Sequence, residues 1–417
     1  MYEKEGSRID ALKLSSTVEH YVIQVRRHLH QYPELSMQEE KTIQFVTEEL
    51  KRMDIPFTIV PDGGIIGKIE GEKPGRTLIL RADLDALPMQ EADVNLSQRK
   101  NVVSKIDGVA HTYGHDAHTA MLLGAADILR QHKESLFGTV LLVFEQGEEI
   151  GGGIHQLLEQ LKKIGADGIW GIHVKNDLPS GKISVEAGPR MAAVMPFDIT
   201  LNGKSGHGSR PDLASSPIDC FVDLHARLSQ MRLKYLDPLK PATFSIGSVH
   251  AGKAANVIPE TLRFSGTFRY LHVEQGKEIQ RHFRRMLTET CRALDCSFAY
   301  NIEPKANHGI VYNDETCANI AEKAVIKAIG SETLAEHPAW MASEPFAIYQ
   351  QHFPGVFAFL GIYNKEKGTV ADHHNVHFDV DEDVLKLGVA VTVQYAIDYL
   401  KHFHFQGEME RRGKSDV

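Results

Sequence analysis

This chain is organised around the stretch Ala110-His111-Thr112-Tyr113-Gly114-His115-Asp116-Ala117-His118, which holds four potential metal ligands or proton carriers within eight residues. Three further clusters of the same residue types follow apolar runs later in the chain: Glu148-Glu149, His173 and His373-His374. Imidazole and carboxylate groups together suit Zn²⁺, Mn²⁺ or Co²⁺. We therefore expect the fold to bring these four stretches together around a metal.

The pair Glu148-Glu149 indicates how such a site would work. If Glu149 binds a metal, Glu148 remains available as the general base that takes a proton from a metal-bound water. Alone, the pair is more typical of the exposed acidic start of a helix, where the helix dipole favours negative charge. The histidine clusters elsewhere in the chain make the catalytic interpretation the better one.

Apolar runs typical of buried strands alternate with helical patterns through the first half of the chain. Strands are predicted at residues 57–60, 65–69, 77–80, 139–144 and 168–174. Helices are predicted at residues 18–30, at 36–53 with Ser36-Met37-Gln38-Glu39 as a capping box, and at 119–131. This alternation indicates an α/β fold with a mostly parallel central sheet flanked by helices. Such sheets place their chemistry at the carboxyl ends of the strands.

From about residue 195 the pattern changes to the order β-α-β-β-α-β, which is that of a ferredoxin-like α+β module. A compact module is tolerated inside a larger domain because its ends lie close together. We predict a discontinuous metal-binding catalytic domain of residues 1–193 and 307–417, with an inserted domain of residues 194–306.

The charge and composition of the chain argue against some classes of binding partner. The chain has 417 residues, a net charge of -9 and scattered basic residues, so neither nucleic acid nor an anionic membrane is an expected partner. No apolar run approaches the roughly 20 residues of a membrane span, and the first ten residues do not resemble a signal peptide. We expect a cytoplasmic protein. The four cysteines show no CxxC spacing, so a zinc–thiolate site is not expected.

Seven short stretches carry a resemblance to a known family: residues 27–35, 80–88, 113–121, 147–149, 171–174, 206–211 and 256–259. In this order they resemble the aminoacylase/carboxypeptidase family of zinc metallopeptidases. Within that family the chain is similar to the amidohydrolase branch of hippurate hydrolases, N-acyl-L-amino-acid amidohydrolases and indole-acetyl-amino-acid hydrolases. The resemblance implies a metal-dependent hydrolase of N-acetyl or N-aroyl amino acids, and a homodimer formed through the inserted dimerisation and lid domain.

The resemblance also implies a set of metal ligands. Carried over by position they are His115, Glu149, His173 and His374, which would hold one or two Zn²⁺ or Mn²⁺ ions per subunit. The branch normally has a Cys ligand two residues before the first of these histidines, where this chain has Tyr113. Because a phenol is a poor ligand near neutral pH, we hypothesise that Asp83 or a bridging water compensates.

The remaining roles are implied in the same way. Glu148 would be the general base and then the proton donor to the leaving amine, while His207 would stabilise the oxyanion. Asp85 would orient a metal ligand. Asn256 and Arg269 would hold the substrate carboxylate, for which a guanidinium is well suited.

Two alternatives remain open from the sequence. The first is a dipeptidase or aminopeptidase, which differs in whether the substrate needs a free α-amino group. The second is a binding or regulatory scaffold whose metal site is impaired by Tyr113. Against this scaffold stands Glu148, because a protein that only binds has no need of a general base.

Overall fold

The computed structural model describes residues 9–415, with side chains for residues 9–404. The chain forms two compact units. The first contains the described residues up to Gly188, together with Tyr312–His337 and those from Ile348 onward, and the second contains Pro189–Val311 and Pro338–Ala347. The chain passes between the units four times, and two of these points lie in the strands β7 (Gly188–Met191) and β14 (Val311–Asn313).

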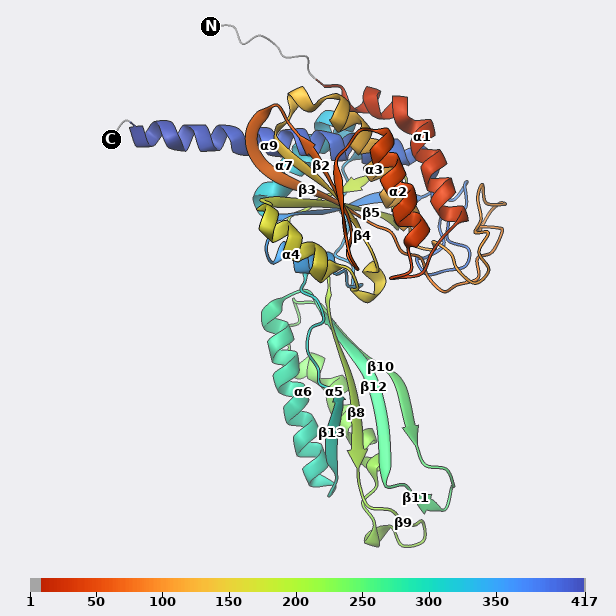
Figure 1. Ribbon diagram of the computed structural model, residues 1–417. Helices are drawn as coiled ribbons and strands as arrows, with labels where there is room; N and C mark the ends of the chain where they lie inside the picture. The colour runs from red at the N-terminus through yellow and green to blue at the C-terminus, as the bar shows by residue number, and fades with distance from the viewer. Residues whose placement is uncertain (1–8, 416–417) are drawn as a thin grey trace. The chain divides into compact units, whose positions relative to one another are not determined.

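The first unit is built on a seven-stranded sheet in the order β1-β2-β4-β3-β5-β15-β6 (Figure 1). The four central strands are parallel to one another, whereas β1, β2 and β6 run antiparallel to their neighbours. This confirms the predicted α/β fold with a mostly parallel central sheet. The bounds are β1 (Phe57–Val60), β2 (Gly64–Glu70), β3 (Lys73–Asp83), β4 (Phe137–Glu145), β5 (Gly168–Pro179), β6 (Ile183–Ser184) and β15 (Gly355–Tyr363).

The central strands are continuous apolar runs because helices cover the sheet. In β4 every side chain from Val140 to Phe144 is at most 1% exposed, as is typical of a strand that is buried on both faces. The helices are α1 (Ala11–Gln31), α2 (Glu40–Arg52), α3 (His115–Gln131), α4 (Ile154–Ile164), α7 (Glu315–Ile329) and α9 (Leu385–Ser415), with the short α8 (Phe346–Gln350). None of the helices in the described part of the chain is both long and apolar enough to cross a membrane.

Helices α1, α3 and α9 pack against one another, and α3 and α9 pack against β3. Gly124 permits this close packing, because a Cβ there would lie 2.5 Å from Cγ2 of Val22 and 3.2 Å from Cγ2 of Val389. A larger residue would separate α1 and α9 from α3. That helix is the one that carries the first metal-ligand candidate.

Three helix starts differ from those predicted. Helix α1 begins at Ala11 and not at residue 18. The capping box at Ser36 is wrong, because α2 begins only at Glu40 and the side chain of its N-cap residue, Glu39, makes no capping hydrogen bond. Glu39 instead accepts hydrogen bonds from the backbone of Gly147 and the side chain of Gln146. Helix α3 begins at His115 and not at residue 119. The histidine cluster is therefore partly helical, which fixes the spacing of its side chains.

The second unit is a four-stranded antiparallel sheet in the order β10-β12-β8-β13 with two helices, and its elements follow one another as β-α-β-β-α-β. Its core contains four phenylalanines, Phe197, Phe264, Phe268 and Phe283. The bounds are β8 (Ala193–Asn202), α5 (Pro217–Lys234), β10 (Ala242–Ala251), β12 (Thr261–Tyr270), α6 (Val273–Ala293) and β13 (Ser297–Ile302), with a separate two-stranded sheet of β9 (Gly206–His207) and β11 (Val257–Ile258). That this unit dimerises or acts as a lid stays a prediction.

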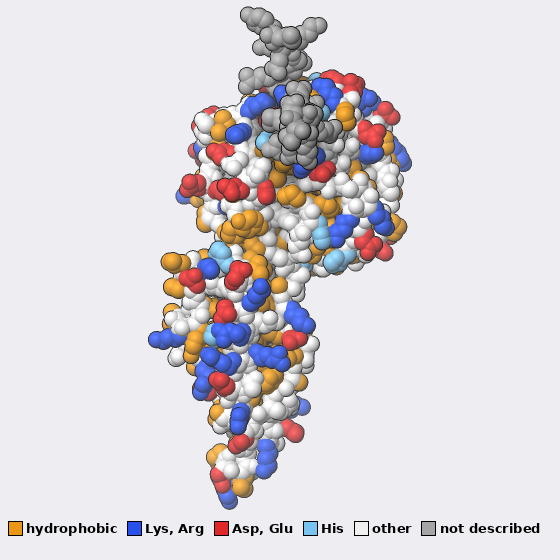
Figure 2. All heavy atoms as spheres, turned by 90° about the vertical axis from the view of Figure 1, so that its left-hand side faces the viewer, with side chains coloured by type: hydrophobic (Ala, Val, Ile, Leu, Met, Phe, Trp, Pro, Cys, Tyr) orange, Lys and Arg blue, Asp and Glu red, His pale blue; other side chains and the backbone are white. Residues whose placement is uncertain are grey.

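Positive and negative side chains are interspersed on the face of the protein shown in Figure 2, over both units. This face therefore presents no continuous region of one charge sign, in keeping with the scattered basic residues of the sequence.

Candidate functional site

The parallel strands of the first unit bring the predicted clusters to one edge of its sheet. Asp83 at the end of β3 is paired in register with Glu145 at the end of β4, and His173 on β5 is paired with Phe359 on β15. Asp85, the Glu148-Glu149 pair and His374 lie in the turns that follow β3, β4 and β15. The carboxyl ends of parallel strands meet at one edge, which is the physical reason that these distant stretches come together.

His115 is the first residue of α3 and is 1% exposed. Its Nδ1 donates to Asp85, with Oδ1 at 3.0 Å and the backbone oxygen at 3.1 Å. Its Nε2 is buried without a hydrogen-bond partner among the described residues, and lies 3.5 Å from Oδ2 of Asp83 and 3.6 Å from Oε2 of Glu148. Burial alone would lower the pKa of His115, but the carboxylates of Asp83 and Asp85 raise it to about 9. A positive charge is therefore favoured at this point.

His173 is held as a neutral imidazole. Burial, together with the nearby rings of His118 and His373, keeps its pKa well below the usual value. Its Nδ1 donates to the backbone oxygen of Val174 at 2.7 Å, so the lone pair is at Nε2. A neutral imidazole with its lone pair at Nε2 is the form that binds metals.

The Glu148-Glu149 pair begins a single 3₁₀ turn (Glu148–Ile150) between two glycines with positive φ, Gly147 at 61° and Gly151 at 64°. The turn is fixed to the sheet by Asp85, whose Oδ2 accepts from the backbone N–H of Glu149 at 3.1 Å. Since Oδ1 of Asp85 binds His115, one carboxylate orients both the histidine and the glutamate turn. The orienting role that the resemblance implies for Asp85 stays a prediction.

His374 completes the cluster from the loop after β15. Its φ is 60°, its backbone N–H donates to Thr112 at 2.9 Å, and its Nε2 lies 3.4 Å from Oε1 of Glu149. Tyr113 is 2% exposed, and its ring centroid lies 3.9 Å from that of His115 and 5.0 Å from that of His374. Burial, then the negative charges of Asp85 and Glu149, raise the pKa of Tyr113 well above its usual value, so the phenol keeps its proton.

Two groups of side chains at this edge have the spacing of metal ligands. They are His115, His118 and His173, and Asp85, His115 and Glu148, with the ligand atoms of each group within 4.8 Å of one another. Imidazole and carboxylate donors fit a divalent transition metal. The observation that decides this fit is the buried Nε2 of His115, which faces two carboxylates and has no hydrogen-bond partner in the part of the chain that the structure describes.

The sequence pattern did not distinguish Asp83 and His118 from the candidate metal ligands, although their side chains are hydrogen-bonded within the protein. Both carboxylate oxygens of Asp83 are engaged, Oδ1 by Nδ1 of His118 at 2.7 Å and Oδ2 by the guanidinium of Arg81 at 2.7 Å. The spacing His115-x-x-His118 was the available signal for the position of His118, because residues three apart share one face of a helix. That signal depends on α3 starting at His115, four residues earlier than predicted.

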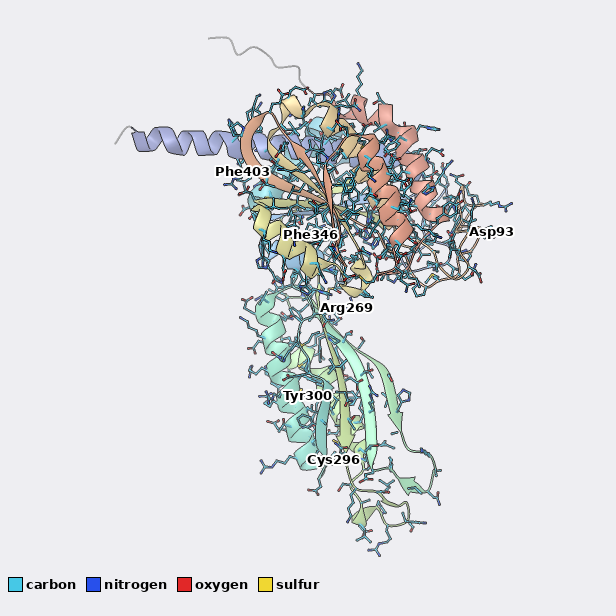
Figure 3. All side chains as sticks on the ribbon, in the orientation of Figure 1. Asp93, Arg269, Cys296, Tyr300, Phe346 and Phe403 are labelled. Carbon is cyan, nitrogen blue, oxygen red and sulfur yellow. The ribbon has the colours of Figure 1, made fainter. Side chains whose placement is uncertain are left out.

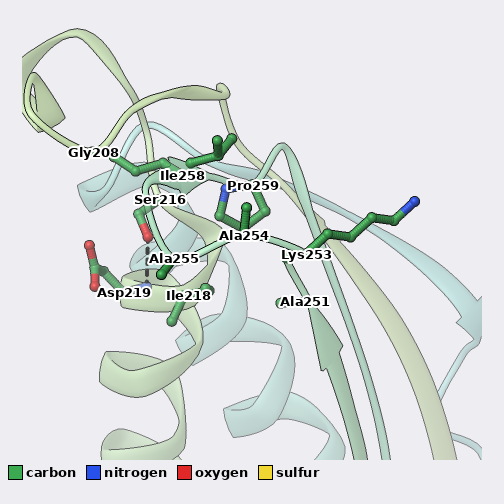
Figure 4. A pocket seen from close by; sticks show the side chains of 12 residues that line it. Gly208, Ser216, Ile218, Asp219, Ala251, Lys253, Ala254, Ala255, Ile258 and Pro259 are labelled. Atoms are coloured by element: carbon green, nitrogen blue, oxygen red, sulfur yellow. Dashed lines mark hydrogen bonds between the residues drawn. The ribbon is translucent and has the colours of Figure 1, made fainter.

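The remaining predicted residues belong to the second unit. His207 on β9 is exposed and its Nδ1 lies 2.8 Å from Oγ of Ser209, while the backbone oxygen of Asn256 accepts from Gly208 at 2.8 Å. His207 and Asn256 therefore lie together. A cavity of about 570 Å³ is lined by residues next to them in the chain, among them Gly208, Ala255 and Val257 (Figure 4).

Arg269 lies elsewhere in the same unit (Figure 3). It is on β12 opposite Val194, whereas the other end of β12, Thr261, pairs with Asn202 next to the β9–β11 sheet. Its guanidinium donates to the backbone oxygen of Met341 at 2.9 Å. One chain thus brings His207 and Asn256 together but places Arg269 at the opposite end of the strand.

Comparisons with known proteins show the family of the chain. The model of peptidase family M20/M25/M40 matches residues 79–398. The chain is 34% identical over 394 residues to thermostable carboxypeptidase 1 of Saccharolobus solfataricus, covering 92% of this chain and 96% of that protein. It is 34% identical over 382 residues to N-acetylcysteine deacetylase of Bacillus subtilis, covering 91% and 97%. A solved Bacillus subtilis structure, described as a dinuclear metal binding peptidase from the M20 family, superposes with a TM-score of 0.79 and 31% identity, covering 93% and 99%.

Proposed function

The chain belongs to peptidase family M20/M25/M40 and is a hydrolase of amide bonds, and from this premise we propose that it cleaves N-acyl amino acids. The observation that carries the proposal is the position of Glu148, whose carboxylate is 5% exposed and lies 3.6 Å from the unpartnered Nε2 of His115. A general base beside a metal ligand is the arrangement that metal-dependent amide hydrolysis uses.

We propose His115, Glu149, His173 and His374 as the ligands of one or two divalent ions per subunit, Zn²⁺ or Mn²⁺. The support is the contact of Glu149 with His374 and the neutral state of His173. These residues would hold the ion, which when bound would supply Lewis-acid chemistry to the scissile carbonyl and would lower the pKa of water.

The protein side chains supply the proton transfers and the binding. Glu148 takes the proton of the attacking water and then gives it to the nitrogen of the leaving amino acid. His207 donates a hydrogen bond to the carbonyl oxygen as negative charge develops there. Asn256 and Arg269 bind the carboxylate of the substrate, the guanidinium through paired hydrogen bonds.

We propose that the protein is a homodimer in which the second copy supplies His207 and Asn256. Thr261 and Arg269 are eight residues apart on β12, which corresponds to roughly 27 Å at ~3.4 Å per residue. One amino acid does not span that distance, so Asn256 and Arg269 of a single chain do not share one substrate. The support for an interface is the edge strand β10 and two exposed apolar side chains in the segment that precedes it, Leu233 at 79% and Leu239 at 87%.

A second candidate function is the removal of an amino acid from a peptide, because the chain is 34% identical to a thermostable carboxypeptidase. Both reactions break an amide next to a free carboxylate. They differ in whether the acyl side carries an α-amino group.

The experiment that separates these functions is amine release from a panel of N-acetyl and N-benzoyl amino acids, with unmodified dipeptides alongside. The protein is stripped of metal and then supplied with Zn²⁺, Mn²⁺ or Co²⁺. We expect metal-dependent release from the acylated substrates. Release from dipeptides alone would move the assignment to a peptidase, and no release with any metal would contradict both.

A further inference from the structure

His118 lies one helical turn after His115 on α3, and both nitrogens of its ring are in use. Nδ1 lies 2.7 Å from Oδ1 of Asp83, and Nε2 accepts from the backbone N–H of Val174 at 3.0 Å. A carboxylate only accepts and a backbone N–H only donates, so the proton is on Nδ1 and the lone pair is on Nε2. That lone pair is already occupied by Val174.

The carboxylate of Asp83 is itself held firmly. The guanidinium of Arg81 binds Oδ2 at 2.7 Å and binds Glu145 at 2.8 Å through Nε. The hydroxyl of Thr119 donates to the backbone oxygen of Asp83 at 2.7 Å. All four residues are at most 4% exposed. A buried network in which every member is hydrogen-bonded is rigid, so it offers His118 a fixed support.

The peptide that His118 binds is the one next to His173. Nδ1 of His173 donates to the backbone oxygen of Val174, while His118 accepts from the N–H of the same residue. The ring centroids of His118 and His173 lie 4.3 Å apart. Gly114 permits this approach, because a Cβ there would lie 2.2 Å from Cγ2 of Val174 and 3.3 Å from Nε2 of His118.

We propose that His118 is a positioning residue that fixes the Val174 peptide and thereby aims Nε2 of His173 at the metal. It is not a metal ligand, although its ring lies within ligand spacing of His115 and His173. The proposal rests on the proposed metal role of His173. Hydrogen-bond partners that orient a ligand commonly change metal affinity by about 10–100-fold when they are lost.

Two substitutions at one position separate positioning from ligation. In His118→Gln the side-chain amide keeps one donor for Asp83 and one acceptor for Val174, but it is a poor ligand for the metal. In His118→Leu both hydrogen bonds are lost. We expect His118→Gln to keep the Zn²⁺ affinity within about 3-fold and His118→Leu to weaken it by about 10–100-fold.

Zn²⁺ affinity is measured on the full chain by competition with a chromophoric chelator. The thermal unfolding midpoint of the metal-free protein is the control for folding, and His132→Gln, at the exposed end of the same helix, is the matched control. If His118→Leu does not fold, the Zn²⁺ affinity of His118→Gln is compared instead with that of His173→Gln, which loses a proposed ligand. The proposal is overturned if His118→Gln loses as much affinity as His118→Leu or His173→Gln. The affinity measurement uses no substrate, so its result does not depend on the proposed hydrolase activity. That activity is tested separately by the amine-release assay.

Discussion

Glu149 and His374 lie with 3.4 Å between Oε1 and Nε2, although more than half of the chain separates them in sequence. The first lies in the turn after β4 and the second in the loop after β15, two strands of one parallel sheet. Both loops therefore open at the same edge. The contact joins the last predicted cluster to the Glu148-Glu149 pair, and the hydrogen bond from the backbone N–H of His374 to Thr112, at 2.9 Å, joins it to the first cluster.

Substitution Glu148→Gln tests the general base. The variant keeps the shape of the side chain but does not accept the proton of water, so we expect kcat to fall by at least ~100-fold. Metal content, measured by mass spectrometry of the purified protein, is expected to stay at the wild-type value. Near-normal turnover in this variant would remove the mechanism, and loss of metal would make Glu148 a ligand.

Mixing two inactive variants tests whether the site is shared between two copies. Glu148→Gln and His207→Ala are each expected to be nearly inactive. If His207 acts on the site of its partner, a mixed dimer has one site in which both residues are intact. Half of randomly mixed dimers are of this kind, so about one quarter of the wild-type activity should return after unfolding and refolding together. No recovery, with a dimer seen by light scattering, would place His207 in its own subunit.

Substitution Tyr113→Cys tests the effect of the tyrosine on the metal content. The phenol keeps its proton in this buried site, and its hydroxyl lies 3.4 Å from the backbone oxygen of Asp85. A thiolate binds divalent metals far better and takes less space between His115 and His374. We expect more metal per chain in Tyr113→Cys and an unchanged amount in Tyr113→Phe. Loss of metal in the Phe variant would show that the phenol is a ligand after all.

Glu91 gives a pH dependence of stability that does not involve the candidate ligands. Its Oε1 lies 2.8 Å from Nε2 of His30 and 2.8 Å from Nζ of Lys100. Burial alone would raise the pKa of Glu91, but His30 and then Lys100 lower it to about 2. The folded-state pKa is below the unfolded one, so this stabilisation is present above about pH 4.5 and is lost as the pH falls towards 2.

The measurement for Glu91 is the free energy of unfolding in urea from pH 7 to pH 3. At about 1.4 kcal/mol per unit of pKa, the ionised group contributes up to about 3 kcal/mol. We expect Glu91→Gln to be less stable at pH 7 and to lose less stability on acidification. Glu70→Gln, at an exposed ion pair with Lys68, is the control. Identical pH profiles for wild type and Glu91→Gln would contradict the assignment.

The sequence by itself determined the fold class, the family and the candidate ligands. The strands of a parallel sheet are covered on both faces, so they consist of continuous apolar runs. Residues 139–144 form such a run, and the sequence therefore predicts a buried strand there. Gly147 and Gly151 flank the glutamates in the sequence, and both adopt the positive φ of the turn, so the residues that make this turn are also local. Each of these signals lies within a few residues of chain.

Only the tertiary structure decided which of the clustered polar groups are hydrogen-bonded by residues from other segments of the chain. Asp83 and His118 have the same chemistry as ligands, but Arg81 and the Val174 amide occupy their oxygens and nitrogens from elsewhere in the fold. The separation of Arg269 from Asn256 follows from strand register, which depends on pairing between distant segments. Hydrogen-bond partners and register are properties of contacts, and contacts between distant segments are not visible in a linear pattern.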